Sequence, residues 1–247
     1  AEHMEAVSAY LMHDLELSQV QVDELWALLG RRDDNEGEEG KQRGKRWVWA
    51  GMDPVSKLML GYVVGDRSLD CTQLLIHMIA VLLAPGCVPL FISDGWSAYG
   101  TALLTHFGHW VQMPRRHKRG ACPKPRWQPL PQLHYAQVVK KRFKGRVVSV
   151  SHRVIYGSLE AITTALTNSV GQVINTAFIE RFNLSLRQHV PALGRKVMSL
   201  AKGEVGLSRQ LTLVQAYYNF CLPHFSLRLP LPHPRPTKGN GSAKVWQ

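Results

Sequence analysis

Residues 19–29 read QVQVDELWALL, and this stretch decides the architecture that we expect. Valine and leucine recur on either side of an acidic pair, Asp23 and Glu24, which predicts a β-strand carrying two charges within an apolar run. A charge in such a position is costly unless it is paired or binds a metal ion. Asp23 is therefore the first candidate functional residue.

Further strand and helix signals follow this stretch. Residues 47–52 (WVWAGM) and 58–64 (LMLGYVV) are predicted strands, residues 69–84 a predicted helix, and residues 88–92 (VPLFI) a short buried strand. Three sequential strands with short links favour an antiparallel meander, and the helix favours a parallel return to a central strand. We therefore expect an α/β protein with a ribonuclease-H-like mixed sheet and flanking helices.

Most of the rest of the chain is predicted to be helical or irregular, and residues 136–156 contain Val-rich stretches. Helices are expected at residues 2–16, 97–107, 158–168, 176–190 and 208–222. The polar, Gly-rich run 31–46 and the Pro-, Arg- and Lys-rich segment 113–134 are expected to be loops, and the tail from Pro223 extended or disordered. Asp66 and Arg67 are expected to form an ion pair that supports a strand end.

The charge balance indicates a polyanionic partner. The 247 residues include 30 Lys and Arg against 18 Asp and Glu, which gives a formal net charge of +12. A domain this basic usually meets a nucleic acid, and the alternative is a basic protein without such a partner. No membrane partner is expected, because the longest apolar run, residues 74–92, is interrupted by His77, Pro85 and Gly86.

The cysteines and the first residues bear on the compartment. The four cysteines include no C-x-x-C pair, so no zinc site or redox motif is predicted. They are expected to be reduced thiols, and the first ten residues, AEHMEAVSAY, lack the pattern of a signal peptide. We therefore expect a cytoplasmic protein.

Two more acids extend the candidate site. Asp94 follows the predicted strand 88–92, at the kind of strand end where ligand-binding residues commonly lie. Glu180 lies in the first turns of the predicted helix 176–190, beside an apolar stripe. Carboxylates from two strands and a helix can converge on Mg²⁺, which takes oxygen ligands. Taken singly, each acid also has a structural interpretation, as an ion-pair partner, a turn residue or part of a solvated helix face.

Two other glutamates compete with Glu180 for the third position. Glu24 follows Asp23 in the predicted strand, so its side chain should point to the opposite face and not share the Asp23 site, unless the strand ends there. Glu160 lies in the predicted helix 158–168, which nothing ties to the central strands. We therefore predict that Glu180 is the third metal-binding acid.

Short blocks spread along the chain resemble one family. They are VDELW at 22–26, RWVW at 46–49, VGDRS at 64–68, SDGWSAY at 93–99, and ERFNLSLRQ at 180–188 followed by GRK at 194–196. Together they resemble the insertion-sequence-one transposase family, from about Asp23 to His224. The resemblance implies a ribonuclease-H-like catalytic domain that cleaves transposon ends and joins them to target DNA. The expected partner is double-stranded DNA, bound by a homo-oligomer.

Carried over by position, the acids of that family are Asp23, Asp94 and Glu180. The resemblance implies that they hold two Mg²⁺ ions, with Mn²⁺ as a substitute. Such paired ions, about 3.5–4 Å apart, can activate an attacking oxygen and stabilise a leaving oxygen. The expected reaction is in-line attack at a DNA phosphodiester.

The resemblance also divides the chain into three parts. Residues 1–18 are expected to be the remnant of an N-terminal DNA-binding helix, residues 19–225 the catalytic domain, and residues 226–247 a basic, Pro-rich tail. Within the catalytic domain, a basic segment is inserted between the second and third acids.

Eight further residues are candidate DNA contacts. They are Asn183, Arg187, Arg195, Lys196, Arg115, Arg116, Lys118 and Arg119. The first four accompany the third acid, where arginine can hold phosphate oxygens, and the last four lie in a basic loop suited to a DNA backbone. A capping or packing role for Asn183 and a solubility role for the basic residues are the alternatives.

Two other functions remain open at this point. The sequence after Lys196 departs from the family pattern, which leaves a catalytically inactive, DNA-binding remnant as an alternative. A structure-selective nuclease of the same fold is a further alternative, and a cluster of four acids would be typical of it.

Overall fold

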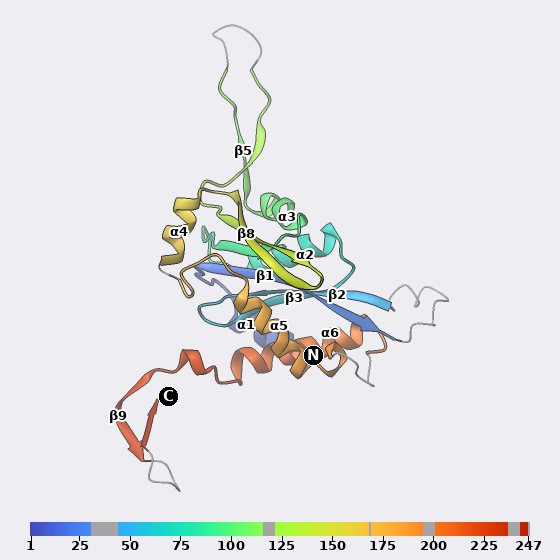
Figure 1. Cartoon of the computed structure of the whole chain (residues 1–247), viewed down its shortest axis with the longest axis vertical. Helices are drawn as coiled ribbons and strands as arrows, with labels where there is room; N and C mark the ends of the chain where they lie inside the picture. The colour runs from blue at the N-terminus through green and yellow to red at the C-terminus, as the bar shows by residue number, and fades with distance from the viewer. Residues whose placement is uncertain (31–43, 116–121, 168, 195–200, 237–242, 247) are drawn as a thin grey trace.

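The computed structural model describes residues 1–30, 44–115, 122–167, 169–194, 201–236 and 243–246. Its centre is a six-stranded mixed sheet with the strand order β3-β2-β1-β4-β7-β8 (Figure 1). These strands are β1 (Gln19–Leu29), β2 (Gly44–Met52), β3 (Met59–Gly65), β4 (Leu90–Asp94), β7 (Tyr135–Phe143) and β8 (Arg146–Tyr156). The expected α/β class with a mixed sheet is confirmed.

The first four strands have the predicted connections. β1, β2 and β3 form an antiparallel meander, and β4 returns parallel to β1. β7 runs parallel to β4, and β8 folds back antiparallel to β7. The ladder between β1 and β4 ends at the pair Val22–Ser93, so Asp23 and Asp94 are the next residues on two adjacent strands.

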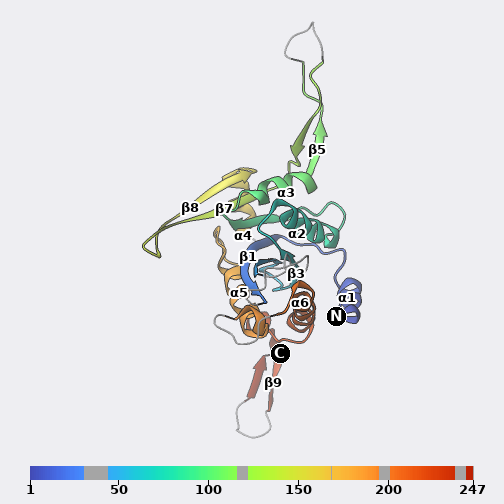
Figure 2. The ribbon, with the colours of Figure 1, turned by 90° about the vertical axis from the view of Figure 1, so that its right-hand side faces the viewer.

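Helices cover both faces of the sheet (Figure 2). They are α1 (Glu2–Leu11), α2 (Leu69–Leu82), α3 (Ala98–His106), α4 (Leu159–Thr167), α5 (Ala177–His189) and α6 (Glu204–Phe220), with the short 3₁₀ helices η2 (Pro191–Leu193) and η3 (Phe225–Leu227). The helices α2 and α3 lie on one face, whereas α5 and α6 lie on the other (Figure 2). α4 packs against the first halves of β4 and β7.

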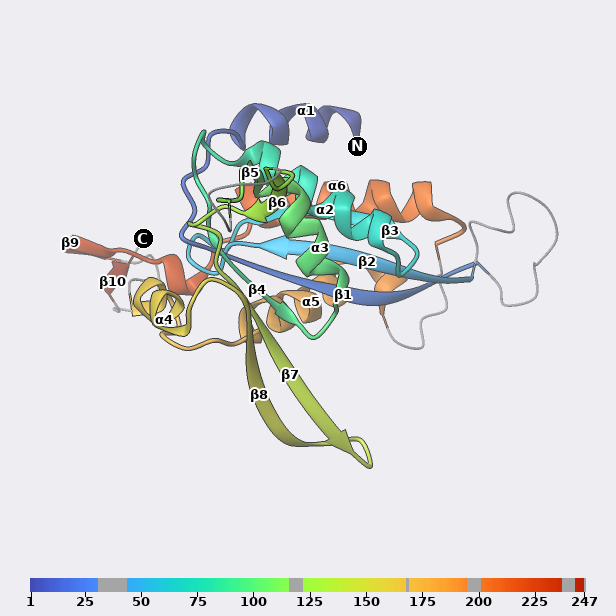
Figure 3. The ribbon, with the colours of Figure 1, turned by 90° about the horizontal axis from the view of Figure 1, so that it is seen from above.

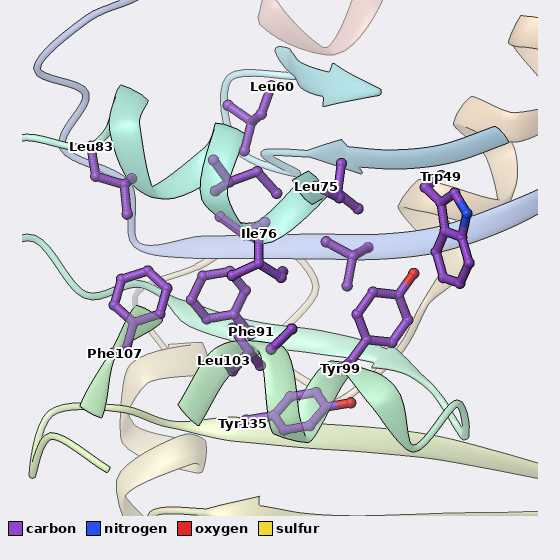
Figure 4. Close-up of a cluster of buried hydrophobic side chains, with 14 of the residues drawn as sticks. Trp49, Leu60, Leu75, Ile76, Leu83, Phe91, Tyr99, Leu103, Phe107 and Tyr135 are labelled. Carbon is purple, nitrogen blue, oxygen red and sulfur yellow. The ribbon is translucent and has the colours of Figure 1, made fainter. Parts of the chain in front are cut away.

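The alternation of side chains along β1 explains these layers. Val20 and Val22 point into the cluster with α2 and α3, whereas Leu25, Ala27 and Leu29 point into the cluster with α5 and α6. The first cluster is rich in aromatic side chains, among them Trp49, Phe91, Tyr99, Phe107 and Tyr135 (Figure 4). A strand buried on both faces requires apolar residues at nearly every position, so the charge of the half-buried Asp23 stands out.

Three segments differ from the sequence-based expectation. The first helix ends at Leu11, because Leu15 pairs with Leu83 in an isolated parallel bridge and draws the chain into an extended path. Within the segment expected to be a loop, β6 (Arg126–Pro129) pairs with β5 (Gly108–Val111). The tail is extended, as expected, but its strands β9 (Pro230–Pro236) and β10 (Ala243–Trp246) pair with each other.

The β5–β6 ribbon projects from the body of the molecule (Figure 1). The rings of Trp110 and Trp127 meet edge to face across it, with centroids 5.5 Å apart. The indole of Trp127 also donates a 2.7 Å hydrogen bond to the Leu104 carbonyl, which ties the base of the ribbon to α3. These long-range aromatic contacts order strands that the loop-like composition concealed.

No helix in the described ranges has both the length and the apolar character needed to cross a membrane.

Candidate active site

The predicted acids meet in a cleft at the carboxyl end of β4. The cleft measures about 510 Å³ and is bounded by β1, β7 and α5. Its lining residues are Asp23, Glu24, Leu25, Asp94, Gly95, Val138, Val139, Lys140, Arg142, Glu180, Asn183, Leu184 and Arg187. The three acids expected from the sequence therefore share one cavity although they are far apart in the chain.

Three carboxylates come closest together in this cleft. Oxygen atoms of Asp23, Glu24 and Asp94 lie within 4.8 Å of one another. The expectation that Glu24 does not share the Asp23 site is therefore wrong. The expectation fails because the neighbouring strand ends early. β4 stops at Asp94, so beyond this point carboxylates on opposite faces of β1 can reach the same space.

Glu24 has its own anchors on the α3 side of the sheet. Its side chain is only 3% exposed, and it is paired with the guanidinium of Arg67. The hydroxyl of Tyr99 lies 3.5 Å from its second oxygen. Arg67 lies over the rings of Trp47 and Trp96, at 4.8 and 4.2 Å from their centroids. Arg67 thus holds Glu24 at the edge of the site.

The expected pairing of Asp66 with Arg67 is wrong. Asp66 instead forms an ion pair with Arg46 on β2, at 3.3 Å, because Asp66 and Arg67 turn to opposite sides of the strand end. Sequence reasoning therefore missed Arg67 as a residue of the site. The available signal was the VGDRS block itself, which contains this arginine.

Crowding of acids shifts the pKa of Asp23. Burial is the first cause, and the negative charges of Asp94 and Glu24 add to it, so that the pKa of Asp23 is raised to about 7. Asn183 on α5 donates a 2.9 Å hydrogen bond to the Oδ2 atom of Asp23. A bound cation would relieve this repulsion between carboxylates.

Glu180 occupies the opposite wall of the cleft and has different partners. Its carboxylate pairs with the ammonium of Lys140 on β7 and accepts a 2.7 Å hydrogen bond from Thr176. Burial acts to raise the pKa of Glu180, but the hydrogen bonds from Lys140 and Thr176 and the charges of Lys140 and Arg142 outweigh it and lower the pKa overall. Glu180 therefore stays ionised, in reach of the cleft but outside the close group of three.

A buried glutamine sets the position of α5 against the sheet. Gln21, two residues before Asp23, accepts a 3.0 Å hydrogen bond from the Ile179 backbone amide and donates a 2.9 Å bond to the Asn175 carbonyl. It is fully buried, so both bonds form away from water. Gln21 thereby fixes the first turn of the helix that carries Glu180. The sequence signal was a second polar residue on the Asp23 face of an apolar strand.

Comparison with known proteins now bears on the identity of this site. No protein-family model matches the chain. Over 170 residues the chain is 24% identical to the insertion element IS1 4 protein InsB of Escherichia coli K12 and to the insertion element IS1 protein InsB of Shigella sonnei. The chain is a relative of the insertion element IS1 proteins.

The aligned region covers 69% of this chain. It covers 63% of the Escherichia coli InsB protein and 80% of the Shigella sonnei InsB protein. The chain thus spans less than two thirds of the length of the first of these IS1 relatives. The resemblance of the sequence blocks to the insertion-sequence-one family is confirmed at the level of these relatives.

The blocks that resemble the IS1 family surround the cleft. VDELW lies in β1, SDGWSAY joins β4 to α3, and ERFNLSLRQ lies in α5. VGDRS contributes Arg67, which pairs with Glu24, and RWVW contributes Trp47, whose ring lies against Arg67. The blocks are therefore close in space although they are spread over the chain.

The predicted DNA contacts divide into three groups. Asn183 and Arg187 line the cleft, and the hydrogen bond from Asn183 to Asp23 supports an orienting role over a capping one. Arg115 is exposed on the β5–β6 ribbon and does not line the cleft. The predicted contacts Arg195, Lys196, Arg116, Lys118 and Arg119 lie outside the described residues.

Two cations of the cleft wall belong to the basic run 139–146, which the sequence indicates as a DNA-backbone contact but which was not assigned to the catalytic site. Lys140 and Arg142 come from β7, a strand whose valine-rich sequence was not assigned to the sheet. Glu160, in contrast, is exposed on α4 and does not line the cleft, in agreement with its exclusion from the site.

Proposed function

We propose that this chain is the catalytic part of a DNA transposase that cleaves phosphodiesters at transposon ends and transfers the ends to target DNA. Asp23, Asp94 and Glu180 are its catalytic acids. The single observation that carries the proposal is their convergence in one cleft with cationic walls. The relationship to insertion element proteins supports the same function.

The fold is proposed to be ribonuclease-H-like. An antiparallel meander followed by a parallel crossover to β4 supports this assignment. So does the placement of the first acid on the central strand and of the second at the end of its parallel neighbour. The carboxyl end of a parallel strand is a position where ligand sites commonly form.

The residues of the cleft fit Mg²⁺ or Mn²⁺. Such hard cations prefer carboxylate oxygens, and oxygen atoms of Asp23, Glu24 and Asp94 already lie within 4.8 Å of one another. Asp23, Asp94 and Glu180 would hold the ions. When bound, a pair of such ions supplies activation of the attacking oxygen and stabilisation of the leaving oxygen.

The remaining side chains of the cleft orient the acids and attract the substrate. Asn183 holds the carboxylate of Asp23 through its hydrogen bond, and Arg67 holds that of Glu24. Arg142 and Arg187 line the same space, where guanidinium groups can contact phosphate oxygens in pairs. Binding to double-stranded DNA as a homo-oligomer is part of the proposal, because transposition requires two ends to be held together.

A structure-selective nuclease is the second candidate function. The observation in its favour is that four acids line the cleft, since Glu24 joins the three that were predicted. Arg67 counts against it, because this cation neutralises Glu24 and leaves it bound to the protein. A catalytically inactive DNA-binding remnant is the remaining alternative. Only a measurement of DNA cleavage distinguishes it from an active transposase.

The test compares cleavage and joining on defined DNA. The protein is incubated with supercoiled plasmid and with labelled duplexes from the DNA that flanks its gene, in Mg²⁺, Mn²⁺ or EDTA. We expect metal-dependent cleavage and joined products, both absent from an Asp94→Asn variant that still binds DNA. Cleavage restricted to branched substrates would identify a nuclease, and binding without cleavage would identify an inactive remnant.

A further inference from the structure

The hairpin formed by β7 and β8 leaves the body of the protein. Figures 2 and 3 show its two strands extending away from the helices that cover the sheet. From Lys141 to Arg153 every residue is exposed, on both strands and on both faces. In contrast, the first residues of β7, including Tyr135 and Ala136, are fully buried. The distal half of the hairpin therefore has no packing partner within the described part of the chain.

The tip is built to be a regular two-residue turn. Lys144 and Gly145 both have positive φ angles, of 47° and 80°, and Phe143 pairs with Arg146. Positive φ at both central positions is the feature of a type I′ turn, whose twist matches that of the paired strands. The ribbon thus keeps the twisted form of a sheet without support from a core.

The composition of the ribbon is one-sided. Residues 139–156 contain three lysines and three arginines and no acidic residue. Between these cations lie large apolar side chains that face solvent, with Phe143 65% and Val148 62% exposed. This mixture favours a partner such as duplex DNA: the cations suit its anionic phosphates, and the exposed apolar side chains suit its bases.

The ribbon begins at the wall of the catalytic cleft. Lys140 pairs with Glu180, and Arg142, two residues further along the same face of β7, lines the same cleft. At about 3.3 Å per residue, the four residues from Lys141 to Lys144 reach roughly 13 Å beyond Lys140. A duplex with a phosphodiester in the cleft is therefore long enough to reach the ribbon as well.

We propose that the β7–β8 hairpin is a DNA-binding arm that inserts into the major groove beside the phosphodiester in the cleft. This inference rests on the proposed function. A major groove about 12 Å wide admits a two-stranded β-ribbon, and phosphates flank it on both sides. The lysines and arginines contact those phosphates, while Phe143 and Val148 face the base edges. A second copy of this chain is a poorer occupant, because two arms of the same positive charge repel each other.

The test compares the DNA binding of two variants: one loses two positive charges at the tip of the hairpin, and the other loses two elsewhere. Lys144→Asn with Arg146→Gln removes two cations and keeps the turn, because asparagine tolerates positive φ. Lys202→Gln with Arg209→Gln removes two exposed cations near and on α6, away from the cleft lining. Thermal unfolding first checks that both variants fold. Binding of a duplex is measured in EDTA between 50 and 200 mM salt.

For the tip variant we expect the negative slope of log K against log salt to decrease in magnitude by up to about 1.8, at roughly 0.9 for each phosphate contact. We expect no such change for the α6 variant. In a dimethyl sulfate footprint, protection of guanine N7, which lies in the major groove, should weaken for the tip variant alone. Equal slopes and footprints for the two variants would overturn the inference.

Two further outcomes separate this inference from the proposed function. Wild-type protein that cleaves DNA in Mg²⁺, with a tip variant that binds like wild type, refutes the arm and leaves the transposase. A tip variant that changes from dimer to monomer in sedimentation, with unchanged DNA binding, also refutes the arm and assigns the free edge of β8 to self-association. Wild-type protein that binds no DNA refutes both.

Discussion

The ammonium group of Lys140 pairs with the carboxylate of Glu180 and joins β7 to α5 across the mouth of the cleft. Glu180 thus has a cation of the protein as its partner, whereas Asp23 accepts its side-chain hydrogen bond from the neutral Asn183. The positive charge of Lys140 therefore compensates the negative charge of Glu180, the third acid. A metal ion that uses Glu180 competes with this lysine.

Replacing Lys140 with methionine is therefore expected to tighten binding of divalent cations. The pair is half exposed, so the competing interaction contributes about 0.2–1 kcal/mol, which corresponds to at most roughly a fivefold lower dissociation constant. Calorimetric titration with Mn²⁺ measures this change.

Lys141→Met is the matched control, because the next residue of β7 carries the same charge but does not line the cleft. It should leave cation affinity near the wild-type value. Weaker binding by the Lys140 variant would mean that the lysine positions Glu180 for the ion instead of competing with it.

The identity of the third acid is decided by comparing three glutamates. Glu180→Gln is expected to abolish DNA cleavage while duplex binding remains, because the substitution removes a metal ligand and no basic residue. Glu24→Gln should lower cleavage by about 10–100-fold, the usual range for a group that orients ligands. Glu160→Gln, on exposed α4, should behave like wild type. Normal cleavage by the Glu180 variant together with an inactive Glu24 variant would transfer the role to Glu24.

Asp23 makes the stability of the metal-free protein depend on pH. Its pKa is raised from 3.8 to about 7 in the folded protein, so the folded state binds this proton more tightly than the unfolded state. The resulting stabilisation is complete below about pH 3.8 and is lost as the pH rises through about 7. Folding at pH 8 therefore has to accommodate a carboxylate that is crowded by other acids.

Asp23→Asn should raise the melting temperature at pH 8 in EDTA and have little effect at pH 4. For a chain of this size each kcal/mol corresponds to about 2–4 °C, so we expect a gain of several degrees at pH 8. The variant should also lose the stabilisation that Mg²⁺ confers on wild type. Equal melting temperatures of variant and wild type across this pH range would contradict the assigned pKa shift.

Asn183 is predicted to act through Asp23. Asn183→Ala removes the 2.9 Å hydrogen bond, and we expect roughly 10–100-fold weaker Mn²⁺ binding and a comparable loss of cleavage. Ser185→Ala, at a half-buried position of the same helix that does not line the cleft, is the control. Loss of helix content or of thermal stability alone, with unchanged Mn²⁺ affinity, would assign Asn183 to packing.

The sequence by itself determined the elements that carry the acids. The apolar run around Asp23, the meander of β1 to β3, the crossover helix α2 and the strand before Asp94 are local patterns, and their connections follow from short links and the handedness of crossovers. The stripe of apolar residues in α5 placed Glu180 beside the packed face. These predictions succeed because local periodicity reflects which side of an element is buried.

Only the tertiary structure decided how the acids are compensated. Arg67 holds Glu24 from 43 residues away, and Lys140 holds Glu180 from 40 residues away. Neither pairing has a local signal, because each depends on which strands become neighbours in the sheet. Glu24 reaches the Asp23 site for the same kind of reason: β4 ends beside it, and the end of a neighbouring strand is invisible in the alternation of β1 itself. The long-range order of the strands therefore determines the charge balance of the cleft.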